Sequence, residues 1–343
     1  MRVLQVDSGR EWRGGQNQVR LLCRELGHDA EIEQVLVTRL GSELAQRAAD
    51  GGTTVQPSAW EIGLDPRAWW HLRRTIATFQ PDVIHAHDSH ALTLVTTVAL
   101  GRKVVATRRV EFRIGRFTAW RRPDRIIAIS EAVKRVLVED NIASEAVDVV
   151  YDGIDVEAVR QAAIPPVNIR QQLGIAEGTP LAVNAAALTG EKDHRTLIRA
   201  AHYARQKRPE LHWVIAGEGK LRDSLVAEIN HLALGDRVHL IGHVDRVDAL
   251  IAEASVFVLS SKSEGLGSVV LNALALGRPV VATDAGGIPE ILPEEALVPV
   301  DAPEAMAQKV VDMLDHATPL PFPPQFSAHA MAHGVLDVYR ALV

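Results

Sequence analysis

Residues 256–290 decide the fold. Their sequence is Val256-Phe-Val-Leu-Ser-Ser-Lys-Ser-Glu264-Gly-Leu-Gly267-Ser-Val-Val-Leu-Asn272-Ala-Leu-Ala-Leu-Gly-Arg-Pro-Val280-Val-Ala-Thr-Asp-Ala-Gly-Gly-Ile-Pro-Glu290. A β-rich apolar run leads through a glycine-containing loop into a helical pattern, and a second strand and a double-glycine loop follow. This order predicts a parallel sheet in which the loop and the helix start offer backbone N–H groups to a diphosphate.

The same alternation of β-rich runs and helical patterns extends outward over the whole chain. The predicted strands are residues 3–6, 34–38, 82–87, 103–107, 125–129 and 147–151, then 181–186, 212–216, 238–241, 256–259, 280–282 and 297–300. The predicted helices are 17–26, 42–49, 69–79, 91–100, 131–138, 194–206, 221–232, 247–254, 268–276, 303–314 and 328–342. The class is therefore α/β, with doubly wound parallel sheets whose ligands bind after the carboxyl ends of strands.

The length and two proline-rich breaks indicate two domains. A chain of 343 residues fits about two domains at roughly 150 residues each. The stretch Ala163-Ile-Pro-Pro-Val-Asn168 is a stiff break, because each proline fixes its own φ and keeps the preceding residue out of the helical region. We expect Rossmann-like domains over 1–164 and 165–325, facing across a cleft, and a C-terminal helix over 326–343 that packs near their junction.

Composition and charge exclude several classes of protein. Hydrophobic residues make up 47% and charged residues 23%, as in an ordinary globular protein, and the net charge of -6 argues against a chain that coats nucleic acid. Cys23 is the single cysteine, so it forms no internal disulfide and is expected to be a buried small side chain. No signal peptide or apolar run of about 20 residues is present, which predicts a cytoplasmic protein.

The first strand ends near a double-glycine loop, Gly14-Gly15, that precedes a helix. Glycines let a backbone approach a phosphate closely, and the helix start presents free N–H groups. A plain tight turn explains the glycines equally well. The dinucleotide fingerprint G-x-G-x-x-G is missing, which argues against a nicotinamide-dependent dehydrogenase.

The segment His85-Ala-His87-Asp-Ser-His90 ends a strand of the first half. Alternate residues of a strand share a face, so His85 and His87 project together, roughly 7 Å apart. Three interpretations stay open: histidines bonded to nearby backbone, a histidine that contacts a polar ligand, and a metal site with His90 or Asp88. The third has no supporting cysteine or helical histidine pair.

Residues 102–125 are strongly basic, with nine Lys and Arg against two acids, so their net charge is +7. Phe112, Phe117 and Trp120 are interleaved with these charges. The segment fits a face toward an anionic lipid headgroup or a phosphorylated acceptor, and also a merely solvated basic face. Nucleic acid is a weaker alternative because the chain as a whole is acidic.

With these motifs in order, the sequence resembles the family 4 glycosyltransferases, retaining enzymes of the GT-B fold. The resemblance covers nearly the whole chain. The segments that carry it are Trp12-Arg-Gly-Gly15, Asp82-Val-Ile-His-Ala-His87, Ile127-Ala-Ile-Ser-Glu131, Tyr151-Asp-Gly-Ile-Asp155, Glu191-Lys192, Gly217-Glu-Gly219 and residues 264–290.

The resemblance implies sugar transfer from a nucleotide donor that is held mainly by the second domain, with the acceptor on the side of the first. The implied catalytic residues are His87, Glu264 and Lys192, where Glu264 and His87 contact the donor sugar and Lys192 binds phosphate. The implied donor-binding residues are Gly14, Gly15, Gly217, Gly219, Leu266, Gly267, Ser268 and Asn272. Arg108, Arg109 and Arg113 are assigned to an anionic acceptor.

Two positions depart from the family pattern. Ala187 stands where the family usually has an arginine, so Lys192 or an arginine from 108–113 must supply that charge. Asn272 stands where the second of two paired glutamates usually binds the ribose hydroxyls. An amide still accepts from and donates to a diol but carries no charge, so we expect altered nucleotide recognition with the fold preserved.

The function predicted from the sequence is that of a metal-independent, retaining, hexosyltransferase-type enzyme. Its donor is a nucleotide-diphosphate sugar, which is a substrate, so no cofactor is expected. Its acceptor is a saccharide or an anionic lipid-linked saccharide, such as lipopolysaccharide core or a cell-envelope glycan, with peripheral contact at the inner face of the membrane. A GT-B nucleotide-sugar epimerase and a non-catalytic nucleotide- or sugar-binding member are the alternatives.

Overall fold

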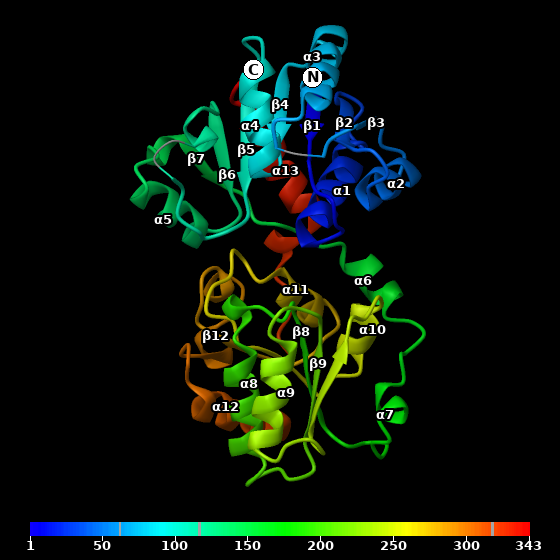
Figure 1. Cartoon of the computed structure of the whole chain (residues 1–343), viewed down its shortest axis with the longest axis vertical. Helices are drawn as coiled ribbons and strands as arrows, with labels where there is room; N and C mark the ends of the chain where they lie inside the picture. Colours follow the sequence, from blue (N-terminus) through cyan, green and yellow to red (C-terminus); the bar gives the residue numbers. More distant parts are fainter. Residues whose placement is uncertain (62, 116–117, 317–318) are drawn as a thin grey trace. The chain divides into compact units, whose positions relative to one another are not determined.

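The computed structural model describes residues 1–343 except 62, 116–117 and 317–318, and it divides into two compact units (Figure 1). Unit 1 comprises Met1–Asp155 and Pro324–Val343, and unit 2 comprises Val156–Pro323. The predicted boundary at residue 164 therefore lies nine residues later than the observed one. The difference arises because helix α6 (Val156–Ala162), which was not predicted, packs on helices of unit 2.

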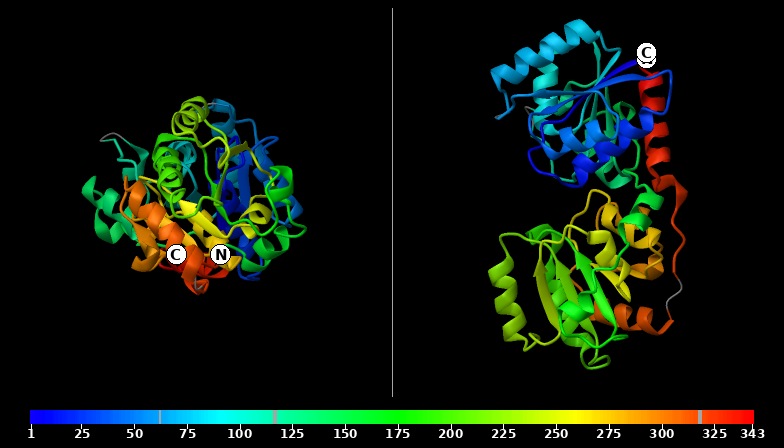
Figure 2. Two further views of the ribbon diagram at one scale, coloured as in Figure 1. Left: turned by 90° about the horizontal axis from the view of Figure 1, so that it is seen from below. Right: turned by 90° about the vertical axis from the view of Figure 1, so that its right-hand side faces the viewer.

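Unit 1 contains a seven-stranded parallel sheet with the order β3-β2-β1-β4-β5-β6-β7. Its strands are β1 (Arg2–Val6), β2 (Glu33–Arg39), β3 (Val55–Ser58), β4 (Val83–Ala86), β5 (Lys103–Arg108), β6 (Arg125–Ala128) and β7 (Val147–Val149). Its helices are α1 (Gly14–Leu26), α2 (Glu43–Asp50), α3 (Pro66–Phe79), α4 (Ser89–Val98), α5 (Glu131–Glu139) and α13 (Ala328–Arg340). Figure 2 shows helices on both faces of this sheet, as the sequence predicts.

The strand β3 was missed by the sequence analysis. It contains Pro57, which lacks a backbone N–H and so argues against a central strand. In the structure β3 is the edge of the sheet and pairs only with β2 on one side. An edge strand tolerates proline because one of its backbone sides needs no partner.

Unit 2 repeats the architecture in a six-stranded parallel sheet with the order β10-β9-β8-β11-β12-β13. Its strands are β8 (Leu181–Ala185), β9 (His212–Ala216), β10 (Val238–Gly242), β11 (Val256–Leu259), β12 (Val280–Thr283) and β13 (Leu297–Val298). Besides α6, its helices are α7 (Ile169–Gln172), α8 (His194–Ala204), α9 (Arg222–His231), α10 (Val247–Ala252), α11 (Ser268–Ala275) and α12 (Pro303–His316). In each sheet the strand order reverses beside the first strand, β1 or β8, and such a switch point is where open α/β sheets bind ligands.

The C-terminal helix α13 is an integral part of unit 1. Met331, Val335 and Tyr339 on α13 are buried in one apolar cluster with Leu22 of α1 and Val83 of β4. The prediction placed this helix near the domain junction, and the structure assigns it to the core of the first unit. Residues about 330 positions apart in sequence thereby become neighbours.

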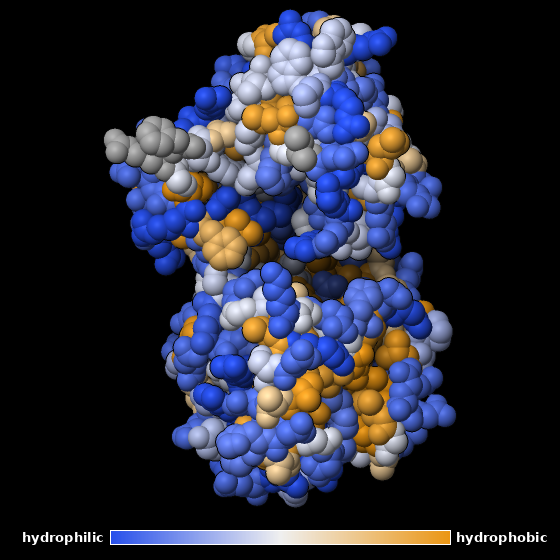
Figure 3. All heavy atoms as spheres, in the orientation of Figure 1, coloured by the Kyte–Doolittle hydropathy of each residue, from blue (hydrophilic) through white to orange (hydrophobic). Residues whose placement is uncertain are grey.

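The surface and the single cysteine match ordinary globular expectations. Cys23 is fully buried, as predicted, and burial raises the pKa of its thiol to about 12. Figure 3 shows hydrophilic residues over most of the visible face, with groups of hydrophobic residues between them, the broadest of them on unit 2. Within the described part of the chain, the helices all fall short of the length and hydropathy that a membrane span requires.

Candidate functional site

The loop after β11 leads into α11 through a glycine that no other residue replaces easily. Gly267 has φ +84°, and a Cβ there would lie 3.1 Å from Ile288 Cγ1. This glycine is the N-cap of α11, and no described side chain caps the helix. Gly267 and Ser268 thus form an uncapped helix start, and such a start suits an anion because its N–H groups carry partial positive charge.

Lys192 and Glu264, predicted separately along the chain, form an ion pair in unit 2. The Lys192 ammonium lies 2.5 Å from Glu264 Oε1, and the Ser261 hydroxyl donates to the same oxygen at 2.8 Å. The side chain of Lys192 is only 24% exposed to solvent, and that of Glu264 only 10%. A cation and a carboxylate thus meet beside the start of α11.

Two further hydrogen bonds hold the loops that carry this pair. The Ser260 hydroxyl donates to the Lys192 carbonyl at 2.9 Å, and the Lys262 N–H donates to the Glu191 carbonyl at 2.7 Å. The two loops follow β8 and β11, which are adjacent strands at the switch point of the sheet. The pair therefore occupies the place where this architecture binds ligands.

Gly217 and Gly219 follow β9, and their observed role is close backbone packing. A Cβ on Gly217 would lie 2.0 Å from the Ala186 carbonyl oxygen, and one on Gly219 would lie 2.4 Å from the Leu188 carbonyl oxygen. Only glycine lets the loops after β8 and β9 approach this closely. Donor binding by these two glycines and by Leu266, which is buried, stays a prediction.

Asn272 has a carboxylate partner that the sequence analysis missed. Its amide Nδ2 donates to Asp248 Oδ1 at 2.6 Å, from α11 to the neighbouring α10. Burial raises the pKa of Asp248, and the hydrogen bond from Asn272 lowers it. An acid therefore stands beside the position where the family pattern has one. Because it comes from another helix 24 residues away, no spacing within one motif could have revealed it.

In unit 1, His87 lies at the end of a chain of buried hydrogen bonds. His87 Nε2 lies 2.8 Å from Gln5 Oε1, and Gln5 Nε2 donates to the Tyr339 hydroxyl at 3.3 Å. The Tyr339 hydroxyl lies 2.6 Å from His85 Nδ1, whose Nε2 lies 2.7 Å from the Thr107 hydroxyl. All five side chains are buried, and they come from β1, β4, β5 and α13 and, for His87, from the residue after β4.

Burial and the hydrogen bonds just described set the protonation state of both histidines. Burial holds the pKa values of His85 and His87 well below 6.5, and the neighbouring His85, for His87, and the charge of Arg109, for both, lower them further. Both imidazoles are therefore neutral. The carbonyl oxygen of Gln5 faces His87 and only accepts, so the proton of His87 sits on Nε2. Nδ1 of His87 is buried without a protein partner among the described residues. On this tautomer Nδ1 is an acceptor that receives no hydrogen bond from the described residues.

The metal interpretation of these histidines gains no support. The rings of His85 and His87 are tilted by 39° with their centroids 4.1 Å apart. Three of their four nitrogens already bond to Tyr339, Thr107 and Gln5. The described residues contain no group of three or more His, Cys, Asp or Glu side chains placed to hold a metal ion.

The double-glycine loop begins α1 directly, and it lies next to Arg109. Gly14 is the first residue of α1, no described side chain caps the helix, and a Cβ on Gly15 would lie 3.8 Å from Arg109 Cδ. Arg109 donates to the His87 carbonyl at 3.3 Å and to Asp152 at 3.2 Å. The loop, Arg109 and His87 are thus brought together at the carboxyl ends of β1, β4 and β5.

The other two arginines that were predicted to bind the acceptor already bond to groups of the protein itself. Arg108 is buried, donates to the carbonyls of Val110 and Phe112, and stacks on Trp120. Arg113 pairs with Glu139 and Asp140 at 3.1 Å each. The net charge counted over residues 102–125 therefore overstates the free positive charge of this segment. The acids that pair with Arg113 lie outside it and were not counted. Phe117 lies outside the described residues.

Asp7 is a buried carboxylate at the end of β1. It accepts from the Gly9 N–H at 2.9 Å, but burial, followed by the charge of Asp88, raises its pKa to about 6. Above that pH the native state holds a buried negative charge that costs free energy. Between about pH 4 and about pH 6 the carboxyl of Asp7 is protonated in the native state and ionised in the unfolded state. The free energy of unfolding therefore falls as the pH rises through this range.

We expect Asp7→Asn to stabilise the protein at neutral pH by up to about 3 kcal/mol, the equivalent of the pKa shift at 1.36 kcal/mol per unit. The gain shrinks as the pH falls below about 6, because the native carboxyl is then already neutral. Thermal unfolding of both proteins at about pH 7.5 and about pH 4.5 measures it, with the exposed Asp50→Asn as control. An equal gain at both pH values would contradict this explanation.

Comparisons with known proteins agree with the architecture. A family model described as Glycosyltransferase Family 4 matches residues 12–158, and one described as Glycosyl transferases group 1 matches residues 167–323. A crystal structure of Anabaena Alr3699/HepE in complex with UDP superposes with a TM-score of 0.83 over 99% of this chain and 100% of that one, at 18% identity. A glycosyltransferase from Rickettsia africae superposes with a TM-score of 0.84 over 99% and 98% of the two chains, at 17% identity. At these identities the superpositions show the fold alone, which is GT-B.

Among curated proteins, the chain is 32% identical over 197 residues to the N-acetylgalactosamine-N,N'-diacetylbacillosaminyl-diphospho-undecaprenol 4-alpha-N-acetylgalactosaminyltransferase of Campylobacter jejuni. That match covers 56% of this chain and 51% of the relative, and this chain spans 61% and 38% of the next two curated relatives. Two family models in the expected order, on two Rossmann-like units, identify the class. The chain belongs to the family 4 glycosyltransferases.

Proposed function

We propose that this protein is a retaining glycosyltransferase that moves a sugar from a nucleoside diphosphate donor to a saccharide or lipid-linked saccharide acceptor. The observation that carries the proposal is the Lys192–Glu264 ion pair beside the uncapped start of α11. The names of the relatives support it, since the Campylobacter protein acts on a diphospho-undecaprenol-linked sugar and the Anabaena structure holds UDP.

The residues of unit 2 suit a departing nucleoside diphosphate. When the bond to the sugar breaks, negative charge grows on the diphosphate. The N–H groups at Gly267 and Ser268 and the Lys192 ammonium are fixed donors for that charge, so they need no reorganisation as it develops. Glu264 is placed to accept from hydroxyl groups of the donor sugar, and its pairing with Lys192 keeps the lysine in position.

The nucleoside end of the donor is assigned to Asn272 and Asp248. Together they present an amide and a carboxylate that a ribose diol can bond to, so Asp248 supplies the charge that Asn272 lacks. On this assignment Asp248 takes the role that the family pattern gives to its second glutamate.

The finer features of the acceptor side belong to the same proposal. Phe112 is 61% exposed within the basic segment 102–125, and an exposed aromatic side chain suits peripheral contact with a membrane. Co-sedimentation with anionic vesicles, with Phe112→Ser as the variant, tests this contact.

A panel of nucleotide sugars tests the central proposal. We expect UDP and at least one nucleotide sugar to bind the full chain. Asp248→Asn is expected to weaken the binding of UDP by about tenfold, since a hydrogen bond to a charged group contributes about 1.5–3 kcal/mol. Asp245→Asn is the matched control, because Asp245 is an exposed acid three residues earlier in the chain. Binding by no nucleotide would end the proposal.

The reaction itself is separated from its two alternatives by product analysis. An epimerase converts the donor with no acceptor and releases a free sugar product, whereas a transferase needs an acceptor for rapid turnover. A non-catalytic binding protein converts no donor, either with or without an acceptor. Net retention is read from the anomeric configuration of the product.

A further inference from the structure

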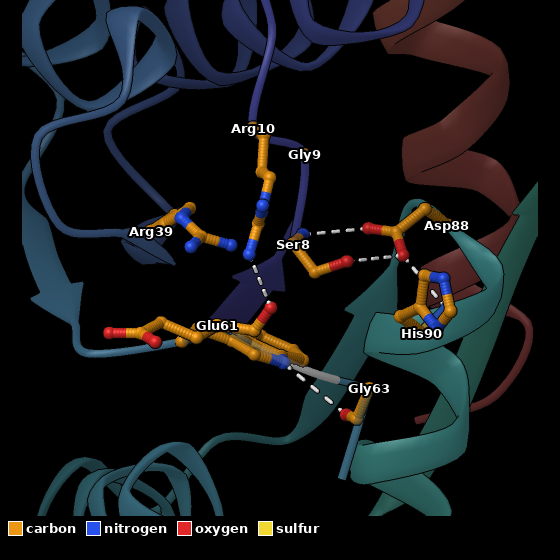
Figure 4. A pocket seen from close by; sticks show the side chains of 9 residues that line it. Ser8, Gly9, Arg10, Arg39, Glu61, Gly63, Asp88 and His90 are labelled. Carbon is orange, nitrogen blue, oxygen red and sulfur yellow. Dashed lines mark hydrogen bonds between the residues drawn. The ribbon is translucent and has the colours of Figure 1, made fainter. Parts of the chain in front are cut away.

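A cavity of about 300 Å³ opens in unit 1 at the carboxyl ends of strands β1, β2, β3 and β4, and its lining does not include Gly14 or Gly15 (Figure 4). Its lining includes Ser8 and Arg10 after β1, Arg39 at the end of β2, Trp60 after β3 and His90 after β4. This volume lies at the small end of the range for ligand pockets and suits a single sugar ring with a substituent.

Two arginines give this cavity a positive character. Figure 4 shows the guanidinium groups of Arg10 and Arg39 directed into the same space. Arg10 donates to a backbone carbonyl, that of Glu61, at 2.7 Å, so no acid neutralises it in that contact. The guanidinium of the half-buried Arg39 has no hydrogen bond or ion pair within the described residues.

The acids at this cavity are already engaged. Asp88 accepts four hydrogen bonds, from the Ser8 N–H and hydroxyl and from the N–H groups of His90 and Ala91. It thereby caps α4 and ties β1 to β4. The Glu61 carboxylate pairs with Arg67 at 3.4 Å. Asp88 keeps its negative charge, but its oxygens accept from these four neutral donors, and Glu61 pairs with Arg67. The guanidinium of Arg39 is the charged group of this lining that is left without a partner among the described residues.

The cavity also has a rigid apolar wall. Trp60 retains only 2% of its exposure, and its indole N–H donates to the Gly63 carbonyl at 3.3 Å. A fixed aromatic side chain next to a few directed polar groups is typical of sites that bind small polar molecules with apolar faces, such as sugar rings.

We propose that this cavity binds an anionic group on the acceptor, so that the acceptor is an acidic saccharide. The proposal rests on the glycosyltransferase function proposed above and names its substrate class. The Arg39 fork binds the two oxygens of a carboxylate or phosphate, Arg10 adds a second cation, and the sugar ring lies over the small part of Trp60 that the lining exposes. The anion is the carboxylate of a uronic acid or the phosphate of a sugar phosphate.

Direct titration of the full chain tests the proposal with D-glucuronate, glucose 6-phosphate, glucose and inorganic phosphate as probes. We expect at least one of the two acidic sugars to bind about tenfold or more tightly than both glucose and inorganic phosphate. The probe that binds more tightly identifies the source of the anion. Equal binding of glucose, or inorganic phosphate binding as well as the sugar phosphate, would overturn the proposal.

Variants locate the binding. Arg39→Gln is expected to weaken binding of the preferred acidic sugar by about tenfold and to leave the thermal midpoint unchanged, because the Arg39 guanidinium gives up no hydrogen bond or ion pair within the described residues. Arg74→Gln, an equal loss of charge on the exposed face of α3, is the control. An unchanged affinity in Arg39→Gln would refute the assignment.

Binding of UDP, measured in the same samples, separates the two proposals. Arg39→Gln should bind UDP as the original protein does, since UDP is assigned to residues of unit 2. Failure of UDP to bind would count against the glycosyltransferase proposal, whereas failure of the acidic sugars alone would count only against this cavity.

Discussion

Lys192→Ala is expected to lower kcat for sugar transfer by about 10²- to 10³-fold, the usual cost of removing one fixed donor from a developing negative charge. Lys192 is the cation that the structure places beside the start of α11, where the charge of the departing diphosphate would be held. Ala187 leaves the usual arginine position without charge, so the effect of losing Lys192 should lie at the upper end of that range.

Glu264→Gln tests the other half of the pair. The amide keeps the shape of the side chain and can still accept from the Ser261 hydroxyl, but it no longer balances the ammonium of Lys192. We expect a similar loss of kcat, and a double variant only slightly worse than either single one, because the two residues act as a unit.

Steady-state kinetics and UDP titration of the three variants provide the measurement. Lys262→Ala is the matched control, since Lys262 lies two residues from Glu264 and pairs instead with Asp193 and Asp301 at 3.4 and 2.6 Å. If Lys192→Ala kept most of its turnover, or if the two single losses simply multiplied in the double variant, the role assigned to the pair would be wrong.

Much of the fold could be predicted because strand and loop signals in this chain are local. Val256–Leu259 is an apolar run with a glycine loop after it, and its burial on both faces of a parallel sheet needs no information from elsewhere. Pro57 sends the opposite local signal, and only the position of β3 at the sheet edge makes it acceptable. Local signals also placed the domain boundary late, since nothing within 156–162 shows that α6 belongs to the second unit.

The candidate site was predictable where a sequence motif marks its residues. Glu264, Gly267 and Ser268 lie in one loop and were found together. The acid beside Asn272 and the tyrosine behind His85 come from other helices, and their contacts depend on how those helices pack. Charge was the least predictable property, because Arg108 and Arg113 are satisfied within the protein while Arg39, in a less basic stretch, is not.

Gln5→Leu is expected to lower kcat by about 10- to 100-fold, although Gln5 itself touches no substrate. Its carbonyl is the group that keeps the proton of His87 on Nε2, and without it a buried polar group loses its partner, at a cost of about 1–3 kcal/mol. His87 then divides between two tautomers, and only one of them presents Nδ1 as an acceptor to a sugar hydroxyl. A loss in kcat with a smaller change in KM is the expected pattern.

Nitrogen-15 NMR of the histidine side chains distinguishes this role from loss of structure. In the unaltered protein Nδ1 of His87 should carry no proton, and in Gln5→Leu the signal should shift toward a mixture of tautomers. Tyr339→Phe should act in the same direction but more weakly, because the Gln5 amide then loses one of the partners that fix its orientation. Thr107→Val removes the hydrogen bond on the far side of His85 and should leave the tautomer of His87 unchanged. A proton found on Nδ1 of His87 in the unaltered protein would reverse the direction of the whole hydrogen-bond chain and make His87 a donor to the sugar.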